Sequence, residues 1–274
     1  MKDLKGKTAA ITGAGSGLGR AMALAFAREG MKIALADVDQ KGLDETASLL
    51  GGAALFSMRV DVSRESDVEE FSRKIDKPYL LCNNAGVSTL GAAWEQSIGD
   101  WQWILGVNLW GVIHGVRAFV PRLIAQGEGH VVNTASVSGL ISPPGSSGYN
   151  VTKHAVVTFS ETLLHDLRER GADVGVSVLC PAYVPTGIAN SERNRPAGLS
   201  AGPRSEETQA REANLKKAVA SGRLSADDVA KAVVAAVKED RFYILTHPRI
   251  KGAIQARMED ILNERAPRDP MRLG

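Results

Sequence analysis

Short apolar runs alternate along the chain with longer segments in which apolar residues recur at helical spacing. The short runs are typical of buried strands and cover residues 8–11, 32–36, 53–60, 79–82, 130–134, 174–179 and 242–246. Strands that alternate with helices form parallel sheets, because each helix returns the chain to the edge where the next strand begins. The pattern therefore predicts an α/β protein with a doubly wound parallel sheet of about seven strands and helices on both faces.

This alternation has no internal repeat or long linker, so we expect one domain over residues 1–274. The least regular stretch, residues 190–205, is rich in Pro, Gly and Ser. Irregular segments at the carboxyl ends of such strands often cover a substrate, and we expect a lid over about residues 187–224. Residues 190–222 should become protected from hydrogen exchange when ligands bind. A final helical pattern predicts an additional C-terminal helix over about residues 248–265.

Composition and charge exclude several classes of protein. The chain has 274 residues and 44% hydrophobic content, enough for one large core. Lys and Arg number 33 against 31 Asp and Glu, without blocks of like charge, which argues against nucleic acid or a membrane as partner. The N-terminal sequence has no apolar leader, so we expect a soluble cytoplasmic protein. Cys82 and Cys180 end apolar runs and are predicted to be buried thiols, neither disulfide-bonded nor part of a metal site.

A glycine-rich stretch, "TGAGSGLGR", lies between the first strand and a predicted helix. The fingerprint G-x-G-x-x-G fails, because a third glycine would be needed where Leu18 stands. A longer pattern, T-G-x-x-x-G-x-G, does fit, through Thr12, Gly13, Gly17 and Gly19. At a strand-to-helix turn, a phosphate can bind free backbone N–H groups and the positive end of the helix dipole. The alternative is a merely flexible glycine loop.

Polar and small residues follow the next three predicted strands. Asp37 ends the second strand, 18 positions after Gly19, where a carboxylate can bind the ribose hydroxyls of an adenosine and repel a 2′-phosphate. Taken alone, Asp37 could equally be a turn or cap residue. Small residues and amides at the next strand ends would let a cofactor pass closely while tying the strands together: Asp61, Val62, Asn83, Asn84, Ala85 and Gly86.

Tyr149 and Lys153 are four residues apart in a helical pattern, so their side chains share one face of the helix. A free phenol titrates near pH ~10, and acid–base work near neutrality would need a pKa lower by about 2 to 3 units. An adjacent ammonium has the right sign to lower it. By itself this spacing is common and proves little.

Together, these motifs resemble the single-domain branch of the short-chain dehydrogenase/reductase family. The resemblance covers residues 5–186 and includes "TGAGSGLG", "NNAG", "VNLWG", "VVNTASVSG", "YNVTK" and "PAYVPT", in the order and spacing of the family. It implies a Rossmann fold and hydride transfer between NAD(H) and a secondary alcohol or ketone. The sequence departs from the family at Ala182, where a glycine is usual, and this adds a methyl group near the expected nicotinamide.

The resemblance also implies four catalytic residues. Tyr149 would be the general acid or base, and Ser136 would donate a hydrogen bond to the reacting oxygen. Lys153 would lower the pKa of Tyr149 and bind the nicotinamide ribose. Asn108 would hold a water behind Lys153, although its amide could also satisfy a helix irregularity. Ser138 is the rival of Ser136, which we favour because it precedes Tyr149 by 13 residues, the usual interval in the family.

The cofactor is expected to be NAD, with NADP less favoured. The usual cation for a 2′-phosphate is missing, because Ser16 and Val38 occupy its positions, and Arg20 is expected to face solvent or another carboxylate. The cofactor-binding residues implied by the resemblance are Gly13, Ser16, Gly17, Leu18, Gly19, Asp37, Val38, Asp61, Val62, Asn84, Ala85, Gly86, Tyr149, Lys153, Pro181, Ala182, Val184 and Thr186.

Substrate and assembly are less constrained by the sequence. The apolar residues expected around the substrate favour a small, mainly hydrophobic molecule: Leu90, Leu140, Ile141, Pro143, Tyr183 and Ile188. We expect a homodimer or homotetramer paired through two long central helices. Four tryptophans are expected to be core or interface anchors: Trp94, Trp101, Trp103 and Trp110. Alternative functions are a dinucleotide-binding redox sensor without catalysis, or an epimerase or dehydratase of the same fold.

Overall fold

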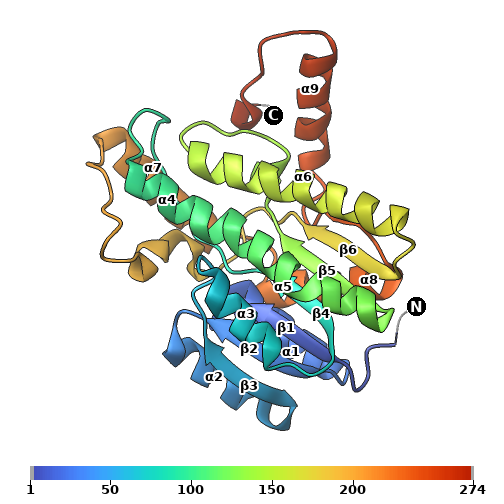
Figure 1. Ribbon diagram of the computed structural model, residues 1–274. Coiled ribbons are helices and arrows are strands. Elements are labelled where there is room, and N and C mark those ends of the chain that lie inside the picture. Colours follow the sequence, from blue (N-terminus) through green and yellow to red (C-terminus); the bar gives the residue numbers. More distant parts are fainter. Residues whose placement is uncertain (1–2, 273–274) are drawn as a thin grey trace.

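A parallel sheet forms the centre of the computed structural model, which describes residues 3–272 (Figure 1). Within these residues the sheet has seven strands in the order β3-β2-β1-β4-β5-β6-β7. The order reverses direction between β1 and β4, which makes the sheet doubly wound, as predicted. The strands are β1 (Thr8–Thr12), β2 (Lys32–Asp37), β3 (Ala54–Arg59), β4 (Pro78–Asn83), β5 (Gly129–Thr134), β6 (Val174–Leu179) and β7 (Tyr243–Ile244).

Helices cover both faces of the sheet. On one face α1 packs against α2 and α8, and on the other α3 packs against α5 while α6 packs against α4. In Figure 1, α9 projects from the body of the molecule and the chain then folds back along it. The helices are α1 (Gly17–Arg28), α2 (Gln40–Leu50), α3 (Glu65–Arg73), α4 (Ile98–Leu105), α5 (Gly111–Gln126), α6 (Ser147–Glu169), α7 (Glu206–Ala220), α8 (Ala226–Glu239) and α9 (Ile250–Leu262).

The uninterrupted apolar runs of the inner strands β1, β4, β5 and β6 arise because both faces of these strands are buried. On β1, Ala9 and Ile11 join the core cluster beneath α1 and α8, whereas Ala10 joins the cluster beneath α3 and α5. The same alternation places Ile33 in the first cluster and Ala34 in the second. Each fully buried large aliphatic side chain contributes roughly 1.5–3 kcal/mol to the free energy of unfolding. The clusters on the two faces together hold the sheet in position.

The observed boundaries differ little from the predicted ones, except at the last strand. The sequence predicts a strand over residues 242–246, but β7 contains only Tyr243–Ile244. Residues 190–205, expected to be irregular, begin within a 3-10 segment, η4 (Gly187–Asn194), and lead to α7. Cys82 and Cys180 are free and buried, as predicted.

The tryptophans have different environments. Trp103 is 3% exposed and belongs to the core, whereas Trp94 and Trp110 are 87% and 51% exposed. Residues Ile98–Gln126 are long and apolar enough to cross a membrane by length and composition alone, but 56% of the relevant window is buried in the protein. That degree of burial is typical of a core helix.

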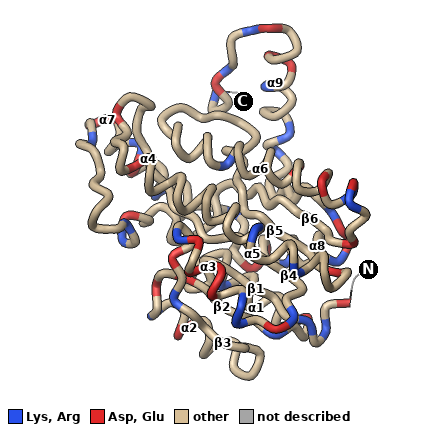
Figure 2. The backbone as a smooth tube through the Cα atoms, viewed as in Figure 1, with Lys and Arg blue, Asp and Glu red and all other residues tan. Residues whose placement is uncertain are grey.

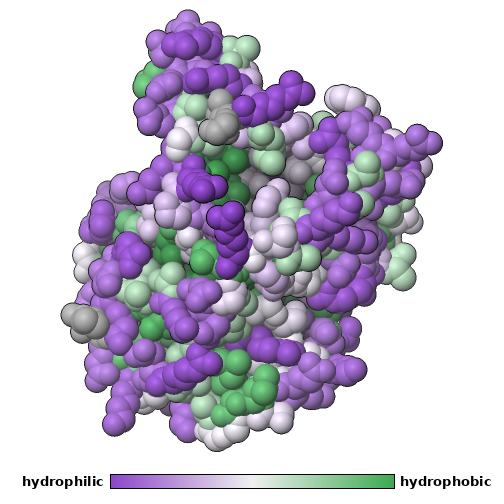
Figure 3. Space-filling model, turned by 180° about the vertical axis from the view of Figure 1, so that it is seen from behind, coloured by the Kyte–Doolittle hydropathy of each residue, from purple (hydrophilic) through white to green (hydrophobic). Residues whose placement is uncertain are grey.

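Acidic and basic residues are intermixed along the described part of the chain, as Figure 2 shows. The face seen in Figure 3 is largely hydrophilic, with hydrophobic side chains gathered at its lower end, where Figure 1 places α2 and β3. A second hydrophobic area lies in the hollow beneath the projecting C-terminal segment.

Candidate active site

The glycine turn between β1 and α1 has a backbone that side chains would obstruct. Gly13 and Gly17 have φ of 65° and 53°, a region that favours glycine. A Cβ at Gly19 would lie 2.0 Å from the carbonyl oxygen of Gly13. The helix begins after Ser16, whose side chain makes no capping hydrogen bond. The first N–H groups of α1 are therefore available for an anion.

Asp37, at the end of β2, is joined to this turn. Its Oδ2 accepts a hydrogen bond from the N–H of Gly15 at 2.8 Å, and its Oδ1 accepts one from the N–H of Asp39 at 3.0 Å. Arg20 lies in an ion pair with Glu45 at 2.9 Å, so it faces another carboxylate, as expected. The carboxylate of Asp37 consequently helps to shape the turn as well as lining the cavity beside it.

The loop after β4 is fastened to β1 by the threonine of the glycine motif. Thr12 Oγ1 accepts hydrogen bonds from the N–H groups of Asn84 and Ala85 at 2.9 and 3.1 Å. In return, Asn84 Nδ2 donates to the carbonyl of Thr12 at 3.0 Å. Asn83 Nδ2 donates to Asn133 Oδ1 on β5 at 2.9 Å. These amides tie three strands together, as the sequence predicts.

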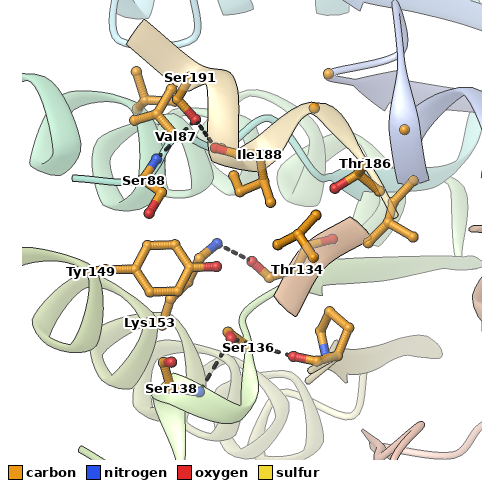
Figure 4. Close-up of a pocket in the computed structure, with 18 of the residues that line it drawn as sticks. Val87, Ser88, Thr134, Ser136, Ser138, Tyr149, Lys153, Thr186, Ile188 and Ser191 are labelled. Carbon is orange, nitrogen blue, oxygen red and sulfur yellow. Dashed lines mark hydrogen bonds between the residues drawn. The ribbon is translucent and has the colours of Figure 1, made fainter. Parts of the chain in front are cut away.

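Tyr149, Lys153 and Ser136 lie around one part of the cavity (Figure 4). The first two project from α6, and Ser136 follows β5. Lys153 Nζ donates to the carbonyl of Thr134 at 2.8 Å and lies 5.6 Å from the ring centroid of Tyr149. Ser136 Oγ accepts the N–H of Ser138 at 3.2 Å. Ser136 lowers the pKa of Tyr149, which favours Ser136 over Ser138 as the residue that acts on the phenol.

The pKa of Tyr149 is shifted in the direction opposite to the expected one. Burial raises the pKa of Tyr149, and the effect of Ser136 offsets only part of this increase. Burial lowers the pKa of Lys153 to about 8. The prediction of a lowered tyrosine pKa is wrong for the protein groups alone, because desolvation disfavours the phenolate more than its neighbours stabilise it.

Asn108 lies behind this group, in a π-helical turn between α4 and α5. Its Oδ1 accepts the N–H of Val87 at 2.8 Å, and its Nδ2 donates to the carbonyl of Val87 at 2.9 Å and to Thr152 Oγ1 at 3.3 Å. A Cβ at Gly86 would lie 3.5 Å from Asn108 Oδ1 and 3.6 Å from Lys153 Nζ. The amide thus secures the loop after β4 close to the lysine without lining the cavity itself.

Ala182, which replaces the usual glycine, adopts an ordinary backbone conformation. Among residues 3–272, the non-glycine residues with positive φ are Asp240 and Glu264. The methyl group therefore causes no left-handed strain at this turn. The N–H of Ala182 donates to His247 Nδ1 at 3.2 Å.

One cavity of about 1650 Å³ joins the glycine turn, Asp37 and the tyrosine group. Every predicted cofactor-binding residue lines it except Gly19, which instead packs against the carbonyl of Gly13. Of the six predicted substrate-wall residues, Leu140 is the exception, since it packs into a core cluster. Part of the wall comes from within residues 187–224, the segment expected to cover the substrate: Arg211, Asn214, Leu215, Ala218 and Val219. The sequence analysis did not predict the wall contributed by the C-terminal segment: His247, Arg249, Ile250, Gly252, Ala253, Ala256, Pro270 and Met271.

A buried carboxylate holds the segment after β6 over the cavity. Asp100, 0% exposed on α4, accepts hydrogen bonds from Arg195 at 2.7 Å and Arg204 at 3.4 Å. The guanidinium of Arg195 also lies 4.2 Å from the ring centroid of Trp103. Burial alone would raise the pKa of Asp100, but the backbone of Ser97 and the two arginines lower it. Sequence analysis missed this cluster because its members are separated by about a hundred positions.

We expect Asp100→Asn to destabilise the protein and loosen this segment. Removing one partner of a buried ion pair costs roughly 3–5 kcal/mol, so the melting temperature should fall by about 6 °C or more. Because the pKa of Asp100 is lowered in the folded protein, the ion pairs of Asp100 stabilise the wild type fully above the unfolded pKa of about 4. This stabilisation is lost as the pH falls through the folded-state pKa. Thermal melts of both proteins at several pH values measure this difference in stability. Asp227→Asn, which removes the charge from an exposed ion pair, is the control.

The glycine turn, the acidic strand end and the serine–tyrosine–lysine group define a Rossmann-fold oxidoreductase. The family model for short chain dehydrogenase matches residues 7–197. The chain belongs to the short-chain dehydrogenase/reductase family.

Relatives with known names support this assignment. A "CLA biosynthesis dehydrogenase/reductase" of Lactiplantibacillus plantarum is 35% identical over 97% of both chains. A "C alpha-dehydrogenase" of Sphingobium is 33% identical over 97% of this chain and 89% of its own. A short-chain dehydrogenase/reductase from Burkholderia phymatum, solved in complex with NAD, matches all of both chains with 49% identity and a TM-score of 0.97.

Proposed function

We propose that the protein transfers hydride between NAD(H) and a secondary alcohol or ketone of mainly hydrophobic character. The observation that carries the proposal is the single cavity that connects Asp37 and the glycine turn with Ser136, Tyr149 and Lys153. The relative from Burkholderia phymatum, similar over its full length, binds NAD.

The residues present fit a dinucleotide. The uncapped start of α1 offers N–H donors to a diphosphate, and Gly13 and Gly17 leave its approach open. Asp37 would accept hydrogen bonds from the adenosine ribose, and Lys153 and Tyr149 line the same cavity. When bound there, the nicotinamide supplies the hydride acceptor or donor.

Side chains of the protein would carry out the proton transfer. Tyr149 Oη would protonate the carbonyl oxygen during reduction or take the hydroxyl proton during oxidation. Ser136 would donate to the same oxygen and stabilise its partial charge. The ammonium of Lys153, held by the Thr134 carbonyl, has the sign of charge that would favour the phenolate. Asn108 would hold the loop after β4 beside Lys153, together with any water that relays the proton.

The proposed substrate character follows from apolar residues that line the cavity. Leu90, Ile141, Pro143, Tyr183 and Ile188 supply apolar surface to the cavity that Tyr149 also lines. Residues 187–224 would act as the lid. One hydrogen bond holds this segment against the loop after β4, since Ser191 Oγ accepts the N–H of Ser88 at 3.1 Å. Hydrogen exchange of residues 190–222 with and without ligands tests this role, and equal protection in both states would exclude it.

We further propose a cytoplasmic homodimer or homotetramer that binds neither nucleic acid nor membrane. The exposed Trp110 and Val151, on the segment leading into α5 and on α6, offer apolar contact surface, while the intermixed charges support no polyanionic partner.

The function is tested by following nicotinamide absorbance with a panel of secondary alcohols and ketones and with each cofactor. NAD-dependent turnover of hydrophobic members is expected. NADH binding without turnover of any panel member would instead favour a redox sensor.

A further inference from the structure

The short last strand leaves one backbone donor of the neighbouring strand end without a backbone partner. In the β6–β7 ladder, the N–H of Val178 donates to the carbonyl of Phe242 at 2.7 Å, and that of Cys180 donates to Ile244 at 3.0 Å. The next donor in this alternation is Ala182. β7 has ended by then, and the N–H of Ala182 donates to the side chain of His247 at 3.2 Å. An imidazole thus replaces the next carbonyl of the ladder.

This hydrogen bond determines the tautomer of His247. A backbone N–H can only donate, so Nδ1 must be unprotonated and the ring proton must be on Nε2. Thr246 Oγ1 lies 2.8 Å from the same Nδ1, and its hydroxyl can also donate to it. Burial lowers the pKa of His247, which keeps the ring neutral and Nδ1 an acceptor near neutral pH.

The other side of the same turn is bonded to the catalytic serine. The carbonyl of Pro181 accepts hydrogen bonds from the N–H of Val137 at 3.0 Å and from Ser136 Oγ at 3.3 Å. A short series of contacts therefore runs from His247 through Ala182 and Pro181 to Ser136. His247, Ala182, Pro181 and Ser136 all line the cavity.

We propose that His247 is a positioning residue that holds the Pro181–Ala182 turn against the nicotinamide end of the cofactor and keeps Ser136 in place. The proposal rests on the proposed function of the cavity. It gives the segment beyond the family motifs a part in the reaction. No part of the proposal requires the histidine to touch substrate.

The test compares His247→Phe, which removes the acceptor but keeps a ring, with His247→Asn, whose Oδ1 can take the place of Nδ1. For His247→Phe we expect kcat to fall about tenfold, the effect of losing about 1.4 kcal/mol. NADH should bind several-fold more weakly, whereas ADP-ribose, which lacks the nicotinamide, should bind as it does to wild type. His247→Asn should recover most of both losses.

His165→Phe and His165→Asn, at an exposed position on α6, are the matched controls and should leave these values unchanged. If His247→Phe fails to fold, His247→Leu and His247→Asn take its place in the same comparison. Equal weakening of NADH and ADP-ribose, or an asparagine variant as impaired as the phenylalanine variant, would overturn the positioning role. Failure of the wild type to bind NADH would overturn the proposed function itself, which distinguishes the two.

Discussion

Replacing Tyr149 with Phe should reduce kcat by about a hundredfold to ten-thousandfold, the usual contribution of general acid–base catalysis. Only the phenolic oxygen is removed, so the ring should remain in contact with the small cluster that contains Val87, Trp103 and Ile104. Steady-state rates measure the loss, while NADH fluorescence titration and thermal melting check that binding and folding are retained.

Ser138→Ala and Ser136→Ala form a matched pair for the same site. The Ser136 variant should lose much of its kcat, because its hydroxyl acts on the phenol and is expected to act on the reacting oxygen. The Ser138 variant should keep its kcat, since it loses only a hydroxyl and the contact of Ser138 with Ser136 uses the backbone N–H.

A Tyr149→Phe variant with more than about a tenth of wild-type activity would show that the proton comes from elsewhere.

Wild-type protein should prefer NAD to NADP by about a hundredfold or more in kcat/KM, because the carboxylate of Asp37 opposes a 2′-phosphate. Asp37→Ala should narrow this preference. Since both carboxylate oxygens of Asp37 accept backbone N–H groups, the alanine variant also disturbs the glycine turn. Asp37→Asn removes the charge and keeps one of the two acceptors, so it should disturb the glycine turn less than Asp37→Ala does.

A cation revealed by the structure sharpens this experiment. Arg59, at the end of β3, donates to the carbonyl of Val38 at 3.1 Å and lines the same cavity. Once the charge of Asp37 is removed, Arg59 should attract a 2′-phosphate, so Asp37→Asn should gain activity with NADP. Adding Arg59→Gln should abolish that gain. Steady-state kinetics with both cofactors decide the matter, and wild type working equally well with NADP would refute the role given to Asp37.

Local patterns were sufficient to predict most of the fold and the main elements of the site. Each of the seven strands lies on a predicted apolar run. The runs are most continuous in the inner strands β1, β4, β5 and β6, because strands buried on both faces require continuous apolar residues. The glycine turn and the Tyr149–Lys153 pair were also recognisable, since each depends on spacing within a single strand-to-helix turn or helix. These features are local, and local conformation follows from neighbouring residues.

Other features were decided only by the tertiary structure. Asp100 has the sequence of an ordinary helix-cap residue, yet it receives Arg195 and Arg204 from across the molecule. His247 completes a ladder that a predicted longer β7 would have completed with its backbone. The pKa of Tyr149 also has the opposite direction from the expectation. Burial and long-range pairing depend on how distant segments pack, and residue spacing along the chain does not specify that packing.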